Sequence, residues 1–206
     1  ILTNSINTQK RIEAFLGLES QVLYPPVDGK EFQYISTEDY YLSFSRLSTV
    51  KRVDHIVKAF QKMPDKKLVV IYWENDPQRM EIFDLAAEYK NISCITLPGN
   101  KWFTEYVGKC IATIYVPIDE DFGMIAVEAM AAGKPVLGVD EWGLKETIVH
   151  KKTGYLISEK AEIDEIVNAV EYLDRIRCIK MKPNCEKRAG DFGLQSFAND
   201  LKKHVE

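Results

Sequence analysis

Hydrophobic positions along the chain fall into short continuous runs separated by segments with helical spacing. The apolar runs have the length of strands, and they cover residues 40–45, 67–73, 91–97, 111–116, 135–139 and 154–157. Helical spacing of apolar residues is found across residues 53–60, 76–89, 102–110 and 124–132. Strands that are apolar on both faces and alternate with helices predict an α/β fold, in which a doubly wound, Rossmann-like parallel sheet is covered on both sides.

The two ends of the chain have a different pattern. A helix is predicted over residues 8–16, ending at Gly17, and paired prolines break a short strand over residues 21–28. Amphipathic helices are predicted over residues 161–175 and 195–205. The resulting segments are an N-terminal linker over 1–38, a ligand-binding domain over 39–190 and a C-terminal helix over 191–206.

Composition excludes several classes of function. The chain has 206 residues, of which 46% are hydrophobic, so it can form a packed core. Its net charge of -4 leaves no basic excess to neutralise a nucleic-acid backbone. No apolar run approaches the roughly 18 residues of a membrane span, and no signal peptide is visible. The four cysteines and three histidines lack metal-ligand spacing, so we expect reduced thiols, no metal site and a cytoplasmic location.

The unusual residue choices gather in residues 118–147. An acidic loop precedes Gly123, and the alanine-rich segment after it predicts a helix that a Gly-x-Pro sequence ends. The first N–H groups of a helix are unpaired and carry a partial positive charge, which suits an anion such as a phosphate. Gly123 lets that anion approach the N–H groups that follow it, those of Met124 and Ile125.

Two carboxylates, Glu120 and Glu128, frame the start of this helix. Glu120 alone fits a plain role as an acid that favours the helix dipole. Glu128 stands among small and apolar residues, where a carboxylate is costly unless something donates hydrogen bonds to it, so a binding role is favoured. The two lie roughly 10 Å apart at about 1.5 Å per helical residue. This separation fits a ligand with hydroxyl groups at both ends and a diphosphate between them.

Cations follow the first strand of the domain, at Arg46, Lys51 and Arg52. Open α/β sheets bind their ligands at the carboxyl ends of the strands. Such clusters are also common as solvated surface charge, and we expect Arg52 to face solvent.

Residues 120–136 resemble the Glu-x7-Glu signature of retaining glycosyltransferases of the GT4 family, which have the two-domain GT-B fold. The match covers Glu-x-Phe-Gly and Glu-Ala-Met-Ala-x-Gly-x-Pro-Val. Arg46 and Lys51 are similar to the family's diphosphate-binding pair. The resemblance implies that the chain is the C-terminal, donor-binding domain and that residues 1–38 include the tail of an absent N-terminal domain. It also implies that the last helix packs on that absent domain.

The resemblance also implies a role for each candidate residue. The catalytic residues are Arg46 and Lys51, which bind the diphosphate, and Glu120, which holds hydroxyls of the donor sugar. Glu128 holds the ribose hydroxyls. The implied donor-binding residues are Gly123, Met124, Ile125 and Glu128. No metal or other cofactor is expected, because the family is metal-independent. Whether a carboxylate attacks the sugar covalently stays open.

The implied activity is transfer of a hexose, with mannose from GDP-mannose favoured, to a glycan or lipid-linked acceptor, as in polysaccharide biosynthesis. Guanine, uracil and adenine donors are not distinguished, and the acceptor contacts the absent domain. The isolated chain is expected to be inactive. The alternatives are a non-catalytic nucleotide-sugar-binding module, an epimerase or phosphorylase of the same fold, and a structural domain without a ligand.

Some segments depart from the family pattern or allow two interpretations. Residues 74–77, Glu-Asn-Asp-Pro, replace the usual Gly-x-Gly turn, which leaves the donor contacts of that loop open. Residues 97–102 weakly match the family's loop near the nucleotide base, and Trp102 is expected to be a core or helix-cap residue rather than a platform for the base. Glu146 belongs to a loop similar to the family's Gly-Gly-x-x-Glu, where it is a structural hydrogen-bonding residue. The basic cluster over residues 175–188 is most simply a solvated face, or else it contacts anionic lipid at the inner face of a membrane.

Overall fold

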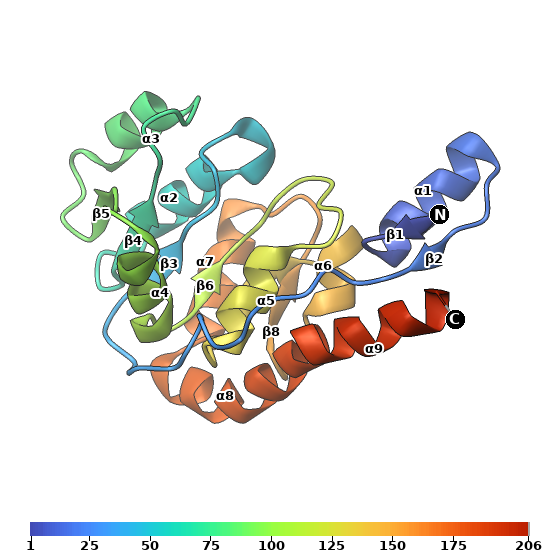
Figure 1. The fold of residues 1–206 in the computed structure, drawn as a ribbon. Coiled ribbons are helices and arrows are strands. Elements are labelled where there is room, and N and C mark those ends of the chain that lie inside the picture. Colours follow the sequence, from blue (N-terminus) through green and yellow to red (C-terminus); the bar gives the residue numbers. More distant parts are fainter. Residues whose placement is uncertain (206) are drawn as a thin grey trace.

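The structure, a computed structural model, describes residues 1–205 and contains a parallel sheet with the strand order β5-β4-β3-β6-β7-β8 (Figure 1). Its strands are β3 (Tyr41–Ser43), β4 (Leu68–Ile71), β5 (Ile92–Ile95), β6 (Thr113–Ile114), β7 (Val136–Val139) and β8 (Gly154–Ile157). The order reverses between β3 and β6, where Leu42 pairs with Thr113. This is the doubly wound arrangement with its switch point at that pair, so the predicted fold class is confirmed.

Helices cover the sheet in two groups. The helices of the domain are α2 (Val53–Gln61), α3 (Arg79–Ala86), α4 (Asn100–Lys109), α5 (Met124–Ala131), α6 (Trp142–Thr147), α7 (Ile163–Tyr172) and α8 (Arg175–Gly190). A 3-10 turn, η1 (Thr49–Lys51), precedes α2. Helix α2 packs against α3 and α7, whereas α5 packs against α8. The strands between them are fully buried at Leu42, Val70 and Leu137. Burial on both faces explains why these strands have continuous apolar runs.

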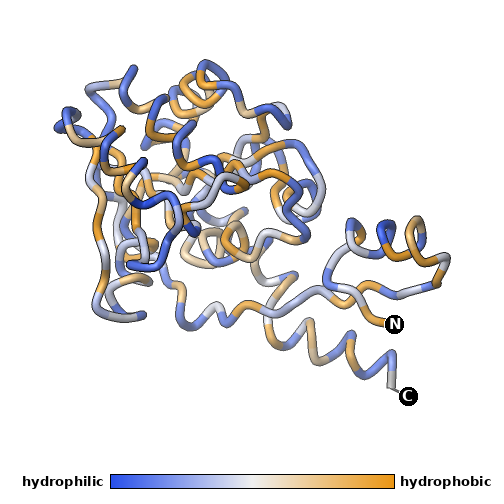
Figure 2. The backbone as a smooth tube through the Cα atoms, turned by 90° about the horizontal axis from the view of Figure 1, so that it is seen from above, coloured by the Kyte–Doolittle hydropathy of each residue, from blue (hydrophilic) through white to orange (hydrophobic). Residues whose placement is uncertain are grey.

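The N-terminal segment forms a small unit outside the main sheet. Strands β1 (Leu2–Thr3) and β2 (Gln21–Val22) pair in parallel around α1 (Ile6–Leu16). Helix α1 ends at Gly17 with a φ of 64°, as predicted. In Figures 1 and 2 this unit and the end of α9 (Leu194–Val205) extend to the same side of the molecule.

Glu146 of α6 ties this unit to the domain. Its carboxylate accepts the backbone N–H groups of Ile6 (2.8 Å) and Asn7 (2.9 Å) and the hydroxyl of Tyr24 (3.0 Å). Burial and the hydrogen bond to Glu146 raise the pKa of Tyr24 to about 12. Glu146 therefore has the structural role that the resemblance implies, although helix α6 itself was not predicted.

The basic cluster belongs to helix α8, which the sequence did not predict. Pro183 inside the helix and the low hydrophobicity of the segment concealed it. Arg188 donates to the backbone carbonyl of Glu146, and Arg175 donates to that of Thr37. The prediction of a solvated face is therefore wrong for these two arginines, because their charge is used to hold distant backbone segments together.

From the sequence, neither a membrane-spanning helix nor a metal site is expected. Among residues 1–205, no helix is both long and apolar enough to cross a bilayer, and no three histidine, cysteine or carboxylate side chains are grouped to hold a metal ion. Cys94, Cys110, Cys178 and Cys185 are free thiols, and all but Cys94 are buried.

Candidate functional site

Neighbouring strands deliver the candidate residues to one edge of the sheet. Strand β3 leads to Arg46 and Lys51, and β6 leads into the acidic loop that carries Glu120. Because both strands are parallel, their carboxyl ends meet at the same edge. The loop ends at Gly123, which has a φ of 86° and precedes the first turn of α5. That φ favours glycine strongly over residues with a Cβ atom.

Lys51, Tyr115 and Glu120 form one hydrogen-bonded cluster. The Lys51 Nζ donates to Tyr115 Oη (2.8 Å) and to Glu120 Oε2 (2.7 Å), and the Tyr115 hydroxyl donates to the same carboxylate oxygen. The backbone N–H of Gly123 donates to Glu120 Oε1 (3.2 Å). Burial alone would raise the pKa of Glu120, but the hydrogen bonds from Lys51 and Tyr115 outweigh it and hold that pKa below its usual value.

Close packing fixes the loop that carries Glu120. A Cβ atom at Gly123 would clash with the Leu144 side chain, and one at Gly143 would clash with the backbone carbonyl of Asp121. The Gly143 N–H also donates to the backbone carbonyl of Glu120 (3.0 Å). These glycines allow α6 to lie against the loop, and this contact fixes the loop backbone at Glu120.

Arg52 is buried, and the prediction that it faces solvent is wrong. Its guanidinium donates to the carbonyls of Val116 (2.6 Å), Pro117 (2.7 Å), Glu159 (2.7 Å) and Lys160 (3.0 Å). Burial lowers its pKa. A single side chain thus satisfies four backbone acceptors at the end of β6 and after β8, because its planar fork of donors reaches several carbonyls at once.

Arg46 and Glu128 lie in the wall of the same cavity, which has a volume of about 500 Å³. Its lining consists of Phe44, Arg46, Trp73, Asn75, Asp76, Phe103, Ile125 and Glu128. The Arg46 side chain is 69% exposed, whereas the Asp76 carboxylate, 3.9 Å from its Nε, is 2% exposed. Arg46 therefore presents its charge at the mouth of the cavity, above a buried carboxylate.

The carboxyl group of Glu128 has an unusual environment. Burial raises its pKa to about 7, and the charge of Glu31 adds to the effect. The pKa of Tyr115 is also raised, first by burial and also by the charges of Glu120 and Glu128. Glu128 is therefore a partly buried acid whose protonation changes near neutral pH.

This shift predicts a pH dependence of stability. Between about pH 4.5 and pH 7 the folded protein holds a proton on Glu128 that the unfolded chain has lost, so this group makes stability fall as pH rises through that window. Glu128→Gln cannot lose that proton, so its free energy of unfolding should exceed the wild-type value by an amount that grows between pH 5 and pH 8. Urea denaturation at both pH values measures the difference, with the exposed Glu88→Gln as control. An equal difference at both pH values would contradict the assignment.

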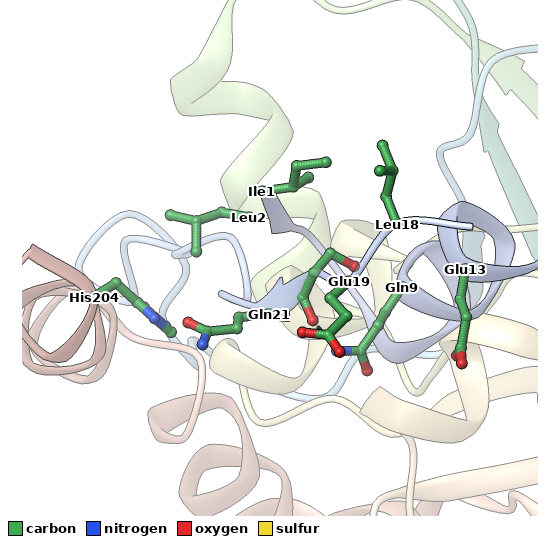
Figure 3. A pocket seen from close by; sticks show the side chains of 9 residues that line it. Ile1, Leu2, Gln9, Glu13, Leu18, Glu19, Gln21 and His204 are labelled. Atoms are coloured by element: carbon green, nitrogen blue, oxygen red, sulfur yellow. Dashed lines mark hydrogen bonds between the residues drawn. The ribbon is translucent and has the colours of Figure 1, made fainter. Parts of the chain in front are cut away.

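A larger cavity, of about 780 Å³, lies between the N-terminal unit and the end of α9. Figure 3 shows Glu13, Glu19 and Gln21 along its wall and His204 reaching in from α9. Its wall carries two carboxylates and no lysine or arginine, so it does not suit a diphosphate. The smaller cavity also has two carboxylates, Asp76 and Glu128, but it has Arg46 as well, and this cation favours it as the phosphate site.

The candidate residues thus fall into two adjoining groups. Lys51 and Glu120 contact each other, whereas Arg46, Ile125 and Glu128 line the cavity, and Met124 is exposed at the start of α5. The sequence did not identify Tyr115, Asp76 and Trp73, which surround these groups. For Tyr115 the one available signal was its aromatic ring at the end of an otherwise aliphatic strand. Trp102 is neither a core residue nor in the cavity wall, because it is 52% exposed on α4.

Comparisons with known proteins bear on the whole domain. The profile of the family described as Glycosyl transferases group 1 matches residues 29–190. An alpha-1,3/1,6-mannosyltransferase of Dictyostelium discoideum is 35% identical over 137 residues, which cover 62% of this chain and 31% of that protein. The N-acetyl-alpha-D-glucosaminyl L-malate synthase of Bacillus anthracis is 29% identical over 131 residues, covering 62% of this chain and 34% of that protein. The chain thus spans about a third of the length of these curated relatives.

Solved structures share the fold. The sucrose-phosphate synthase of Thermosynechococcus elongatus has a TM-score of 0.88 at 18% identity, covering 99% of this chain and 57% of that one. HepE of Anabaena, in complex with UDP-glucose, has a TM-score of 0.84 at 18% identity, covering 99% of this chain and 62% of that one. At this identity the likeness concerns the fold, which the switch-point topology already defines.

Proposed function

Because the chain belongs to the glycosyl transferases group 1 family, we propose that it is the donor-binding part of an enzyme that transfers a hexose from a nucleotide-diphosphate sugar with retention at the anomeric carbon. The observation that carries the proposal is the placement of two cations and two carboxylates around the start of α5, at the switch point of the sheet. A diphosphate fits between the cations, and the hydroxyl-rich ends of the donor fit the carboxylates.

The hydrogen-bonding capacity of the cluster supports this arrangement. An ammonium group has three N–H donors, and Lys51 uses two of them on Tyr115 and Glu120. The third is available to a phosphate oxygen. Glu120 Oε1 has one donor, the N–H of Gly123, and a carboxylate oxygen can accept two, so it can also accept a hydroxyl of the donor sugar.

The chemistry requires stabilisation of a leaving diphosphate. As the glycosyl–phosphate bond breaks, negative charge grows on the diphosphate while the sugar becomes positive in character. Arg46 and Lys51 would each add a charge-assisted hydrogen bond, worth roughly 1.5 to 3 kcal/mol. The N–H groups at the start of α5 add a smaller dipolar contribution of about 0.3 to 1 kcal/mol. In this proposal these groups serve without a metal ion, and the leaving phosphate oxygen accepts the proton of the acceptor.

The identity of the sugar is the finer part of the proposal. We favour mannose carried on GDP, because the mannosyltransferase of Dictyostelium discoideum is among the similar proteins. The acceptor, a glycan or a lipid-linked sugar, would contact a further domain that packs against the N-terminal unit and α9. An enzyme acting on a lipid-linked acceptor would work at the cytoplasmic face of a membrane.

Calorimetric titration of the chain with GDP, UDP and ADP tests the proposal. We expect one of the three to bind, in the presence of a chelator, and Glu128→Ala to weaken that binding about 10-fold or more, because a charge-assisted hydrogen bond is lost. Glu88→Ala, on the surface away from the site, should bind like the wild type. If none of the three nucleotides binds the chain or raises its thermal stability, the proposal is refuted.

A further inference from the structure

Trp73 follows β4 and directly precedes residues 74–77, the segment that stands in place of the family's glycine turn. Trp73 lies two residues beyond the end of β4, which pairs with β3 in the sheet. Its side chain lines the same cavity as Arg46 and Glu128, and the residue is 48% exposed. About half of this large aromatic side chain is therefore accessible to a ligand that enters the cavity.

The loop holds Trp73 in a defined position. The buried Asp76 carboxylate accepts the backbone N–H of Trp73 (2.8 Å), and the Asp76 N–H donates to the Trp73 carbonyl (3.0 Å). The next turn is anchored as well, because the Gln78 N–H donates to the carbonyl of Leu47 (3.0 Å). Asp76 also lies beneath Arg46. One buried carboxylate therefore organises both the tryptophan and the cation at the cavity mouth.

The rest of the cavity wall indicates which part of a ligand meets Trp73. Phe44 and Phe103 pack edge to face, with ring centroids 5.1 Å apart, and present an apolar surface. Ile125 and Glu128 are three residues apart on α5 and so share one face of that helix. If Glu128 holds the ribose, the group attached to the ribose enters a space walled by aromatic and aliphatic side chains. A planar, apolar-faced nucleobase suits such a space.

We propose that the indole of Trp73 stacks on the nucleobase of the donor, an inference that rests on the proposed function because it takes Glu128 as the ribose-binding residue. The indole would contribute affinity for any base, since every base has a π-face.

The test compares nucleotide binding by Trp73→Ala, Trp73→Phe and Trp102→Ala, using whichever nucleoside diphosphate binds the wild type. Trp73→Ala should weaken binding about 5- to 150-fold, the range that follows from loss of one stacked base. Trp73→Phe should recover most of the affinity, and Trp102→Ala, an equally exposed tryptophan outside the cavity, should bind like the wild type. Inorganic pyrophosphate should bind Trp73→Ala and the wild type equally.

The outcomes separate this inference from the function it rests on. If the wild type binds a nucleotide and Trp73→Ala binds it as tightly, stacking on Trp73 is wrong while the proposed function stands. If Trp73→Ala loses pyrophosphate binding to the same extent as nucleotide binding, the indole acts on the phosphates or the loop and not on the base. Binding of no nucleotide by the wild type removes both proposals.

Discussion

Under the proposed function, replacing Arg46 with alanine should lower the turnover number of the full-length enzyme by about 100- to 1000-fold, the range for removing one preorganised donor at a site of developing charge. The guanidinium lies at the mouth of the cavity, above the buried Asp76 carboxylate. Under the proposed function, negative charge on the diphosphate increases as the glycosyl bond breaks, so Arg46 would interact more strongly with the transition state than with the bound donor. The affinity for the nucleotide should therefore fall less than the turnover.

Steady-state rates with saturating donor, combined with nucleotide titration of each variant, measure the two effects. Lys58→Ala is the control, because Lys58 pairs with Asp54 on the surface of α2 and lies outside the site. If Arg46→Ala reduced nucleotide affinity and left turnover at the wild-type value, Arg46 would be a binding residue only. The assignment of a catalytic role would then be wrong.

Arg52→Met should lower the free energy of unfolding by about 3 kcal/mol or more. The substitution keeps most of the side-chain length but removes the donor from four backbone carbonyls. The bonds to the carbonyls of Val116 and Pro117 are buried, and a buried acceptor without a partner costs about 1 to 3 kcal/mol. Because Arg52 joins the end of β6 to the segment after β8, the loss should affect the loop that carries Glu120. Urea denaturation measures the change.

Arg11→Met provides the comparison for Arg52→Met. Arg11 pairs with Asp121 at the surface, where ion pairs contribute at most about 1 kcal/mol. Equal stability losses in the two variants would show that the carbonyl network around Arg52 contributes no more than a surface ion pair, contrary to the structure.

The parallel sheet was predictable because its central strands β3, β6 and β7 are buried on both faces. A strand of that kind has a continuous apolar run, and every strand of the main sheet lies within such a run. Helix α8 was not predictable in the same way. Its positions are mostly polar, and Pro183 is a signal against a helix interior. Packing against α5 stabilises it, and that tertiary contact has no local signature.

In the candidate site, too, features set by nearby residues were predictable and features set by distant residues were not. Glu120, Gly123 and Glu128 stand close together in sequence, so their spacing on a loop and a helix could be read directly. Arg52 could not, since its acceptors are 64 and 107 residues away and backbone carbonyls have no sequence signal. The same holds for Asp76, whose role depends on its burial beneath Arg46. The sequence therefore indicates the candidate ligand-binding groups more readily than the groups that position them.

The position of a bound nucleoside diphosphate tests the central claim most directly. In crystals of the chain grown with the nucleotide that binds it, the phosphate oxygens should lie within about 2.7 to 3.2 Å of Lys51 Nζ and of the N–H groups at the start of α5. The Arg46 guanidinium should close over them, and the ribose hydroxyls should bond to Glu128. A nucleotide found instead in the cavity beside His204, or phosphates out of reach of both cations, would contradict the account.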